Sequence, residues 1–114
     1  MERPRLVELS DEAFERFVSR GLAVVEFATT WCVACHVQEE VMEELAASLG
    51  GTVRFGRVNA ETSQLPSLLR VHAVPTLIVF RDGREVQRFV GAQPKDLVLR
   101  AIERHARPTE GGAR

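Results

Sequence analysis

The chain has no long hydrophobic run and almost no net charge, and each absence excludes a class of function. No apolar stretch among its 114 residues approaches the roughly 20 that are needed to span a bilayer. The formal net charge of −1, from 15 basic and 16 acidic residues, gives no electrostatic reason to expect binding to nucleic acid or to an anionic membrane. We therefore expect a protein that acts on neither.

Cysteine is also scarce, and the usual signatures of secretion and of nucleotide cofactors are missing. The first residues lead into a polar segment rather than into the apolar core of a secretion signal, which predicts a cytoplasmic protein. In that compartment the 2 cysteines are more typical of catalysis than of a structural cross-link. No Gly-x-Gly-x-x-Gly fingerprint is present, so we expect neither flavin nor nicotinamide binding.

The length suits one domain, which we place at residues 1–107, followed by a polar, glycine-rich tail at 108–114 that we expect to be disordered. Hydrophobic patterns predict strands after a short extended segment, at Leu22–Ala28, which is mostly apolar and β-branched, and at Val53–Asn59, Thr76–Phe80 and Glu85–Val90. They predict helices that begin near Ser10, Cys32, Thr62 and Pro94, the third of them weak and ending near Val71. This order indicates an α/β fold, with a central mixed β-sheet flanked by helices on both faces.

Apolar residues at helical spacing define the expected inner face of the second helix. These residues are Ala34, Val37, Val41, Leu45 and Leu49. The opposite face, which carries several glutamates including Glu39, is expected to be solvated.

Both cysteines lie in the run Trp-Cys-Val-Ala-Cys-His, at residues 31–36, between a predicted strand and a predicted helix. A Cys-x-x-Cys pair near a β-α-β pattern indicates a thiol–disulfide redox centre, and this spacing permits one disulfide. Cys32 would lie at a helix N-terminus, where free N–H groups and the helix dipole stabilise a thiolate and lower its pKa from about 8.5. Catalytic groups of open α/β sheets lie beyond the carboxyl ends of strands, as Cys32 does here.

Several segments, taken in order and at their separations, resemble the thioredoxin family. They are Val24–Phe27, Trp31–Cys35, Val74–Leu77, Phe80–Gly83 and Phe89–Ala92. The resemblance spans about residues 6–107 and implies the thioredoxin fold and a protein disulfide oxidoreductase that reduces disulfides by dithiol exchange. It also implies a monomer that acts on disulfide-containing proteins, receives electrons from a separate reductase, and needs no cofactor beyond its own redox-active disulfide.

The resemblance assigns a role to each motif. Cys32 would attack the target and Cys35 would resolve the mixed disulfide. The Val74–Pro75 peptide would be cis and would face the disulfide. The expected substrate-binding residues are Trp31, Val33, Val74, Pro75 and Gly91.

The sequence departs from the family pattern at five positions, one of which is Ala28, where many members have a second tryptophan. Val33 and Ala34 stand where the family usually has Gly-Pro. The redox potential and the docking of targets therefore do not follow from the resemblance. Glu26 occupies the position of a buried aspartate that is thought to relay a proton to the inner cysteine, and burial should raise its pKa toward that of a useful base. Arg57 matches a family lysine near that acid, so we expect it to pair with Glu26 and keep it more ionised. A purely structural ion pair is the alternative.

Other interpretations of the cysteine motif remain. Residues 32–36 also match a c-type haem attachment site, in which His36 would bind iron, although the flanking strand and helix would leave no haem pocket. Zinc would need two further ligands, for which His72 and His105 are the candidates. A thioredoxin-like scaffold without redox activity is a third alternative. We expect no metal site.

Overall fold

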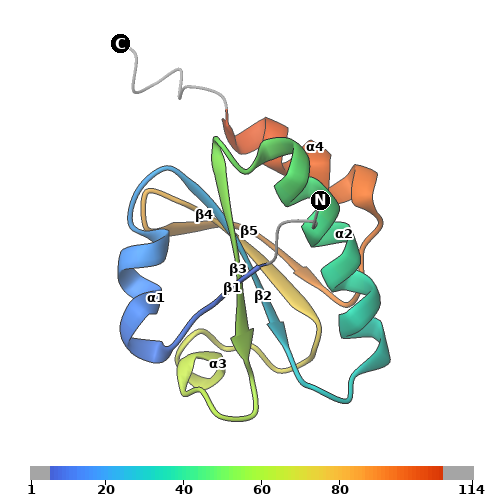
Figure 1. Cartoon of the computed structure of the whole chain (residues 1–114). Helices are drawn as coiled ribbons and strands as arrows, with labels where there is room; N and C mark the ends of the chain where they lie inside the picture. Colours follow the sequence, from blue (N-terminus) through green and yellow to red (C-terminus); the bar gives the residue numbers. More distant parts are fainter. Residues whose placement is uncertain (1–5, 107–114) are drawn as a thin grey trace.

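The computed structural model describes residues 6–106, which are built around a five-stranded sheet of order β1-β3-β2-β4-β5 (Figure 1). The strands are β1 (Val7–Glu8), β2 (Leu22–Ala28), β3 (Val53–Asn59), β4 (Thr76–Arg81) and β5 (Arg84–Val90). β1, β3 and β2 are parallel, whereas β4 and β5 run antiparallel to their neighbours. The predicted mixed sheet is therefore confirmed. The tail expected at residues 108–114 lies outside the described part of the chain.

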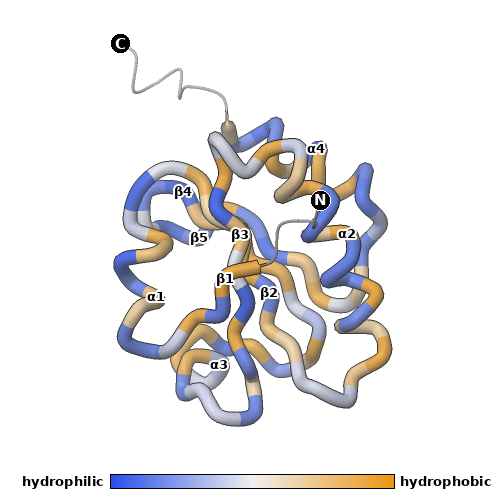
Figure 2. Tube along the Cα trace, in the orientation of Figure 1, coloured by the Kyte–Doolittle hydropathy of each residue, from blue (hydrophilic) through white to orange (hydrophobic). Residues whose placement is uncertain are grey.

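Helices cover both faces of the sheet. They are α1 (Asp11–Val18), α2 (Val33–Leu49), α3 (Leu65–Leu68) and α4 (Lys95–Ala106). Alternate side chains of each strand point to opposite faces, so two apolar cores form, one beneath α1 and α3 and the other beneath α2 and α4 (Figure 1). Figure 2 shows hydrophobic and hydrophilic residues alternating along α1 and α4, as one-sided burial requires.

Two helices differ from the sequence prediction. The third predicted helix shrinks to the four residues of α3, after which Arg70 adopts a positive φ of 58°. The predicted inner face of α2 is wrong at its start: Ala34 and Val37 are exposed, and the buried residues there are Cys35 and Gln38. Hydrophobic spacing misplaced this face because Gln38, a polar residue, is buried by pairing with another segment.

The register of the sheet brings three loops to one end. Phe27, near the end of β2, pairs with Thr76 at the start of β4, and Thr76 pairs with Val90 at the end of β5. The segment after β2, the segment before β4 and the segment after β5 therefore all lie at the same end of the sheet. This end of the sheet carries both cysteines.

Candidate functional site

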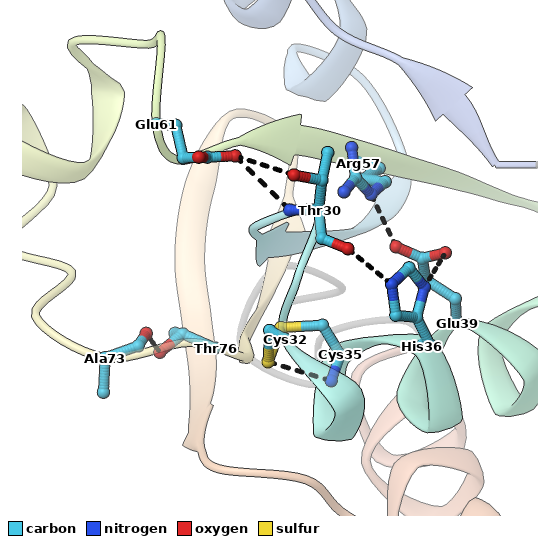
Figure 3. The surroundings of a disulfide bond; sticks show 9 residues. All are labelled: Thr30, Cys32, Cys35, His36, Glu39, Arg57, Glu61, Ala73 and Thr76. Atoms are coloured by element: carbon cyan, nitrogen blue, oxygen red, sulfur yellow. Dashed lines mark hydrogen bonds and ion pairs between the residues drawn. A yellow bond between two sulfur atoms is a disulfide. The ribbon is translucent and has the colours of Figure 1, made fainter.

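The two cysteines form a disulfide at the start of α2, with their Cα atoms 5.2 Å apart (Figure 3). Cys32 is the N-cap residue, with extended backbone, and its Sγ accepts a hydrogen bond from the Cys35 N–H at 3.1 Å. Cys32 is partly exposed, whereas Cys35 is completely buried. An incoming target can therefore reach one sulfur of the pair more easily than the other.

Large apolar side chains around the disulfide are unusually exposed. Trp31 and Val33, on either side of Cys32, each have 76% of their surface exposed, and Val37 follows one turn along α2 with 56%. Solvated apolar groups that gather in one place mark a contact surface. Two of these three residues flank Cys32, the more exposed cysteine, in the chain.

The loop before β4 and the loop after β5 are joined by a backbone hydrogen bond. The Val74–Pro75 peptide is cis, as the sequence resemblance implied. The Pro75 carbonyl accepts a hydrogen bond from the Gly91 N–H at 2.8 Å. Gly91 has a φ of 91°, a conformation that other residues rarely adopt, and a Cβ atom there would meet no neighbour within 4 Å. The space beside Gly91 is therefore open.

Glu26 lies in the middle of β2 and is fully buried. Among residues 6–106 neither of its carboxyl oxygens has a hydrogen-bond partner. Burial raises the pKa of Glu26 to about 8; the negative charge of Glu39 adds to the rise and the positive charge of Arg57 opposes it. At neutral pH this carboxyl group is therefore mostly protonated, with a minor ionised fraction.

Arg57 does not form the expected hydrogen-bonded ion pair with Glu26. The two residues are register partners on β2 and β3. The guanidinium group instead donates from Nε to Glu39 at 2.5 Å (Figure 3), and it contacts Glu8 at 3.3 Å. Keeping a carboxylate charged costs less desolvation free energy near the surface than in the buried site of Glu26. Arg57 therefore pairs with Glu39 and Glu8. Sequence analysis missed both, because it assigned Glu39 to a solvated helix face and gave Glu8 no role.

His36 ties the first turn of α2 to the loop that precedes Cys32 (Figure 3). Its Nε2–H donates to the Thr30 carbonyl at 2.7 Å, and its Nδ1 lies 4.0 Å from Glu39. Glu61 holds the same loop by accepting hydrogen bonds from the Thr30 N–H and Oγ1. The loop is thus fixed on both sides.

The geometry bears on two of the remaining alternatives, the haem site and the metal site. The sulfurs that a haem would require are bonded to each other, and the His36 Nε2 is engaged by Thr30. Within residues 6–106 no group of three or more histidine, cysteine, aspartate or glutamate residues is placed to hold a metal ion. No helix of the same range is long and apolar enough to cross a bilayer.

Comparison with known proteins gives consistent matches over most of the chain. The family model described as Thioredoxin matches residues 5–104. A thioredoxin of Chlamydia pneumoniae is 37% identical over 99 residues, which cover 86% of this chain and 96% of the relative. A thioredoxin of Staphylococcus saprophyticus is 35% identical over 101 residues, or 88% and 97% of the two chains. The solved structure of a mutant thioredoxin from Halobacterium salinarum matches with a TM-score of 0.85 at 25% identity, and the match covers 96% of this chain and 97% of that one.

Proposed function

Since this chain belongs to the thioredoxin family and is a protein disulfide oxidoreductase, we propose that it reduces protein disulfides, with Cys32 as the nucleophile and Cys35 as the resolving thiol. The observation that carries the assignment is the asymmetry of the pair. The Cys32 sulfur is the more accessible one and lies at the N-terminus of α2, where the Cys35 N–H and the helix dipole stabilise a thiolate. Cys35 is buried behind it.

The exchange moves two electrons from the dithiol to the target. The Cys32 thiolate attacks one sulfur of the target disulfide, so that this bond breaks, a mixed disulfide forms and the first target thiolate leaves. The Cys35 thiolate then attacks the Cys32 sulfur. The Cys32–Cys35 disulfide forms and the second target thiolate is released.

The second step needs a base, because Cys35 must lose its proton in a buried site. We assign this role to Glu26, which is buried on the sheet face that α2 covers and whose pKa is raised to about 8. With a pKa of about 8, roughly one tenth of the Glu26 carboxyl groups are ionised at pH 7, and this carboxylate form accepts the Cys35 proton. Arg57 acts as a charge partner at a distance: it opposes the rise in the Glu26 pKa while it is held by Glu39 and Glu8.

The docking surface proposed for the target surrounds the disulfide. Trp31 and Val33 supply exposed apolar contacts, and Val33 replaces the glycine usual in the family with a branched side chain beside the nucleophile. Val74, Pro75 and Gly91 present backbone to an extended target segment, and the open space beside Gly91 accommodates it.

Members of this family typically act on disulfide substrates together with a reductase, and they generally need no cofactor. We extend both statements to this chain: a separate reductase returns two electrons to the Cys32–Cys35 disulfide, and no other redox group takes part. The catalytic unit is a monomer formed by residues 1–107. A reductant of this kind works where thiols are kept reduced, so we place it in the cytoplasm.

Equilibration with glutathione or dithiothreitol buffers, followed by trapping of free thiols, tests the direction of the reaction. A reductase should give a two-electron potential near that of thioredoxin, about −270 mV. A value between about −180 and −120 mV would instead indicate an isomerase or an oxidant. The double variant Cys32→Ser with Cys35→Ser is the control and should show no couple.

A further inference from the structure

A buried glutamine one turn beyond Cys35 is bonded to the loop after β5. Gln38 is 1% exposed, and its side-chain amide pairs with the backbone of Gln93 in both directions. The Gln38 Nε2 donates to the Gln93 carbonyl at 3.1 Å, and the Gln93 N–H donates to the Gln38 Oε1 at 2.6 Å. The Gln38 amide thus pairs with both backbone groups of Gln93, as a residue of an adjacent strand would, and it connects the loop to α2.

The loop that Gln38 holds also carries Gly91. Residues 91–93 belong to no helix or strand, and the Gly91 N–H donates to the Pro75 carbonyl at 2.8 Å. Hydrogen bonds therefore connect Gln38 to Gln93, and Gly91, two residues earlier, to Pro75. Gln38 and Cys35 lie on the same buried face of α2, so this chain of contacts links the helix that bears the disulfide to both backbone segments of the docking surface.

Filling space does not account for an amide at this position. Leucine or methionine would fill a buried site of similar volume without the cost of removing two polar groups from water. That cost is offset here only because both ends of the Gln38 amide are paired with the loop. Without these bonds, the N–H and carbonyl groups of Gln93 would lose their partners on α2, and the loop would no longer be tied to the helix.

We propose that Gln38 is a positioning residue, which sets Gly91 and Pro75 for the binding of an extended protein segment. This inference rests on the proposed function. The hydrogen bonds of the Gln38 side chain go to the Gln93 backbone and to neither sulfur. Its loss should weaken the docking of protein disulfides, which use the backbone of both loops, and should spare small disulfides, which need only the Cys32 sulfur.

The test compares Gln38→Leu with Gln87→Leu on two substrates. Gln87 is a matched control: it is partly buried on β5, where it bonds to His105 and Arg104, and it takes no part in the docking surface. The substrates are insulin, whose disulfides lie within a protein, and the small aromatic disulfide 5,5′-dithiobis(2-nitrobenzoate). Amide hydrogen exchange at Gly91 and Gln93 provides a second, structural readout.

Gln38→Leu should raise the KM for insulin about five- to tenfold, which corresponds to the loss of one to two hydrogen bonds, with little change in kcat. The rate with the small disulfide should stay within about twofold of the wild type, since thiolate chemistry is unchanged. The amides of Gly91 and Gln93 should exchange faster. Gln87→Leu should change none of these quantities.

An unchanged KM for insulin, or an equal loss with both substrates, would overturn the proposal. Gln38→Met keeps the unbranched shape of glutamine, so it must give the same split between substrates whether or not the leucine variant folds. If the wild-type protein reduced neither substrate, the proposed function itself would fail, and this outcome is separate from a failure of the Gln38 proposal.

Discussion

Replacing Glu26 by glutamine should make the protein more stable, and increasingly so as the pH rises. The Glu26 carboxyl group is completely buried and, within residues 6–106, has no hydrogen-bond partner. Its pKa is about 8 in the folded protein, against an ordinary value of 4.5. Glutamine has nearly the same shape and no proton to lose, so it removes this titration while preserving the volume of the site.

The size of the effect follows from the difference between the two pKa values. Between pH 4.5 and about 8 the unfolded chain releases the Glu26 proton, whereas the folded protein retains it. The folded state then binds more protons, so the free energy of unfolding decreases as the pH rises, by about 1.4 kcal/mol for each pH unit. From about pH 5 to about pH 8 this group should cost the wild type about 3 to 4 kcal/mol, and the decrease should level off above about pH 8.

Urea denaturation of the oxidised protein across this pH range measures the effect directly. The gain in unfolding free energy of Glu26→Gln over the wild type should increase by about 3 kcal/mol between about pH 5 and about pH 8. Glu40→Gln, an exposed substitution on α2, is the control and should follow the wild-type curve. If the curves of Glu26→Gln and the wild type ran parallel across the range, the carboxyl group would not titrate as the structure requires.

Three further substitutions test other features of the fold and site. Glu39→Gln removes a negative charge that raises the Glu26 pKa, so the pH-dependent loss of stability should be smaller and end at a lower pH; an unchanged urea profile would contradict this coupling. Gly91→Ala forces a side chain into a φ of 91° and should cost about 1 kcal/mol of unfolding free energy, although the added Cβ meets no neighbour. Equal stability would show that this conformation is not required. Ser10→Ala removes the oxygen that caps α1 and should lower the unfolding free energy by about 1 kcal/mol, as measured in urea at neutral pH. A loss of less than a few tenths would argue against the cap.

Features set by local sequence could be predicted well. The β2 strand and the disulfide at the start of α2 each depend on residues close together in the chain. The third predicted helix is longer than the observed α3. The apolar residues near α3 pack on the sheet without continuing the helix, so their pattern suggested extra helical turns.

Contacts between distant elements could not be predicted from spacing. The pairing of Arg57 with Glu39 depends on how closely α2 lies over β3, and the sequence places the two residues 18 positions apart. The sequence pattern indicates that Gln38 is a polar surface residue, because its partner Gln93 lies 55 positions away. In both cases the burial and pairing of a polar helix residue depend on a partner in a distant segment, which hydrophobic periodicity does not reveal.

The roles of the two cysteines can be tested most directly by trapping the mixed disulfide. The reduced Cys35→Ser variant is incubated with insulin, and the products are separated without reductant and mapped by mass spectrometry. The account predicts a stable adduct joined through Cys32, which dithiothreitol releases, and no adduct in the matched Cys32→Ser variant. An adduct that forms through Cys35 in Cys32→Ser, or no adduct in either variant, would contradict the assignment of Cys32 as the nucleophile.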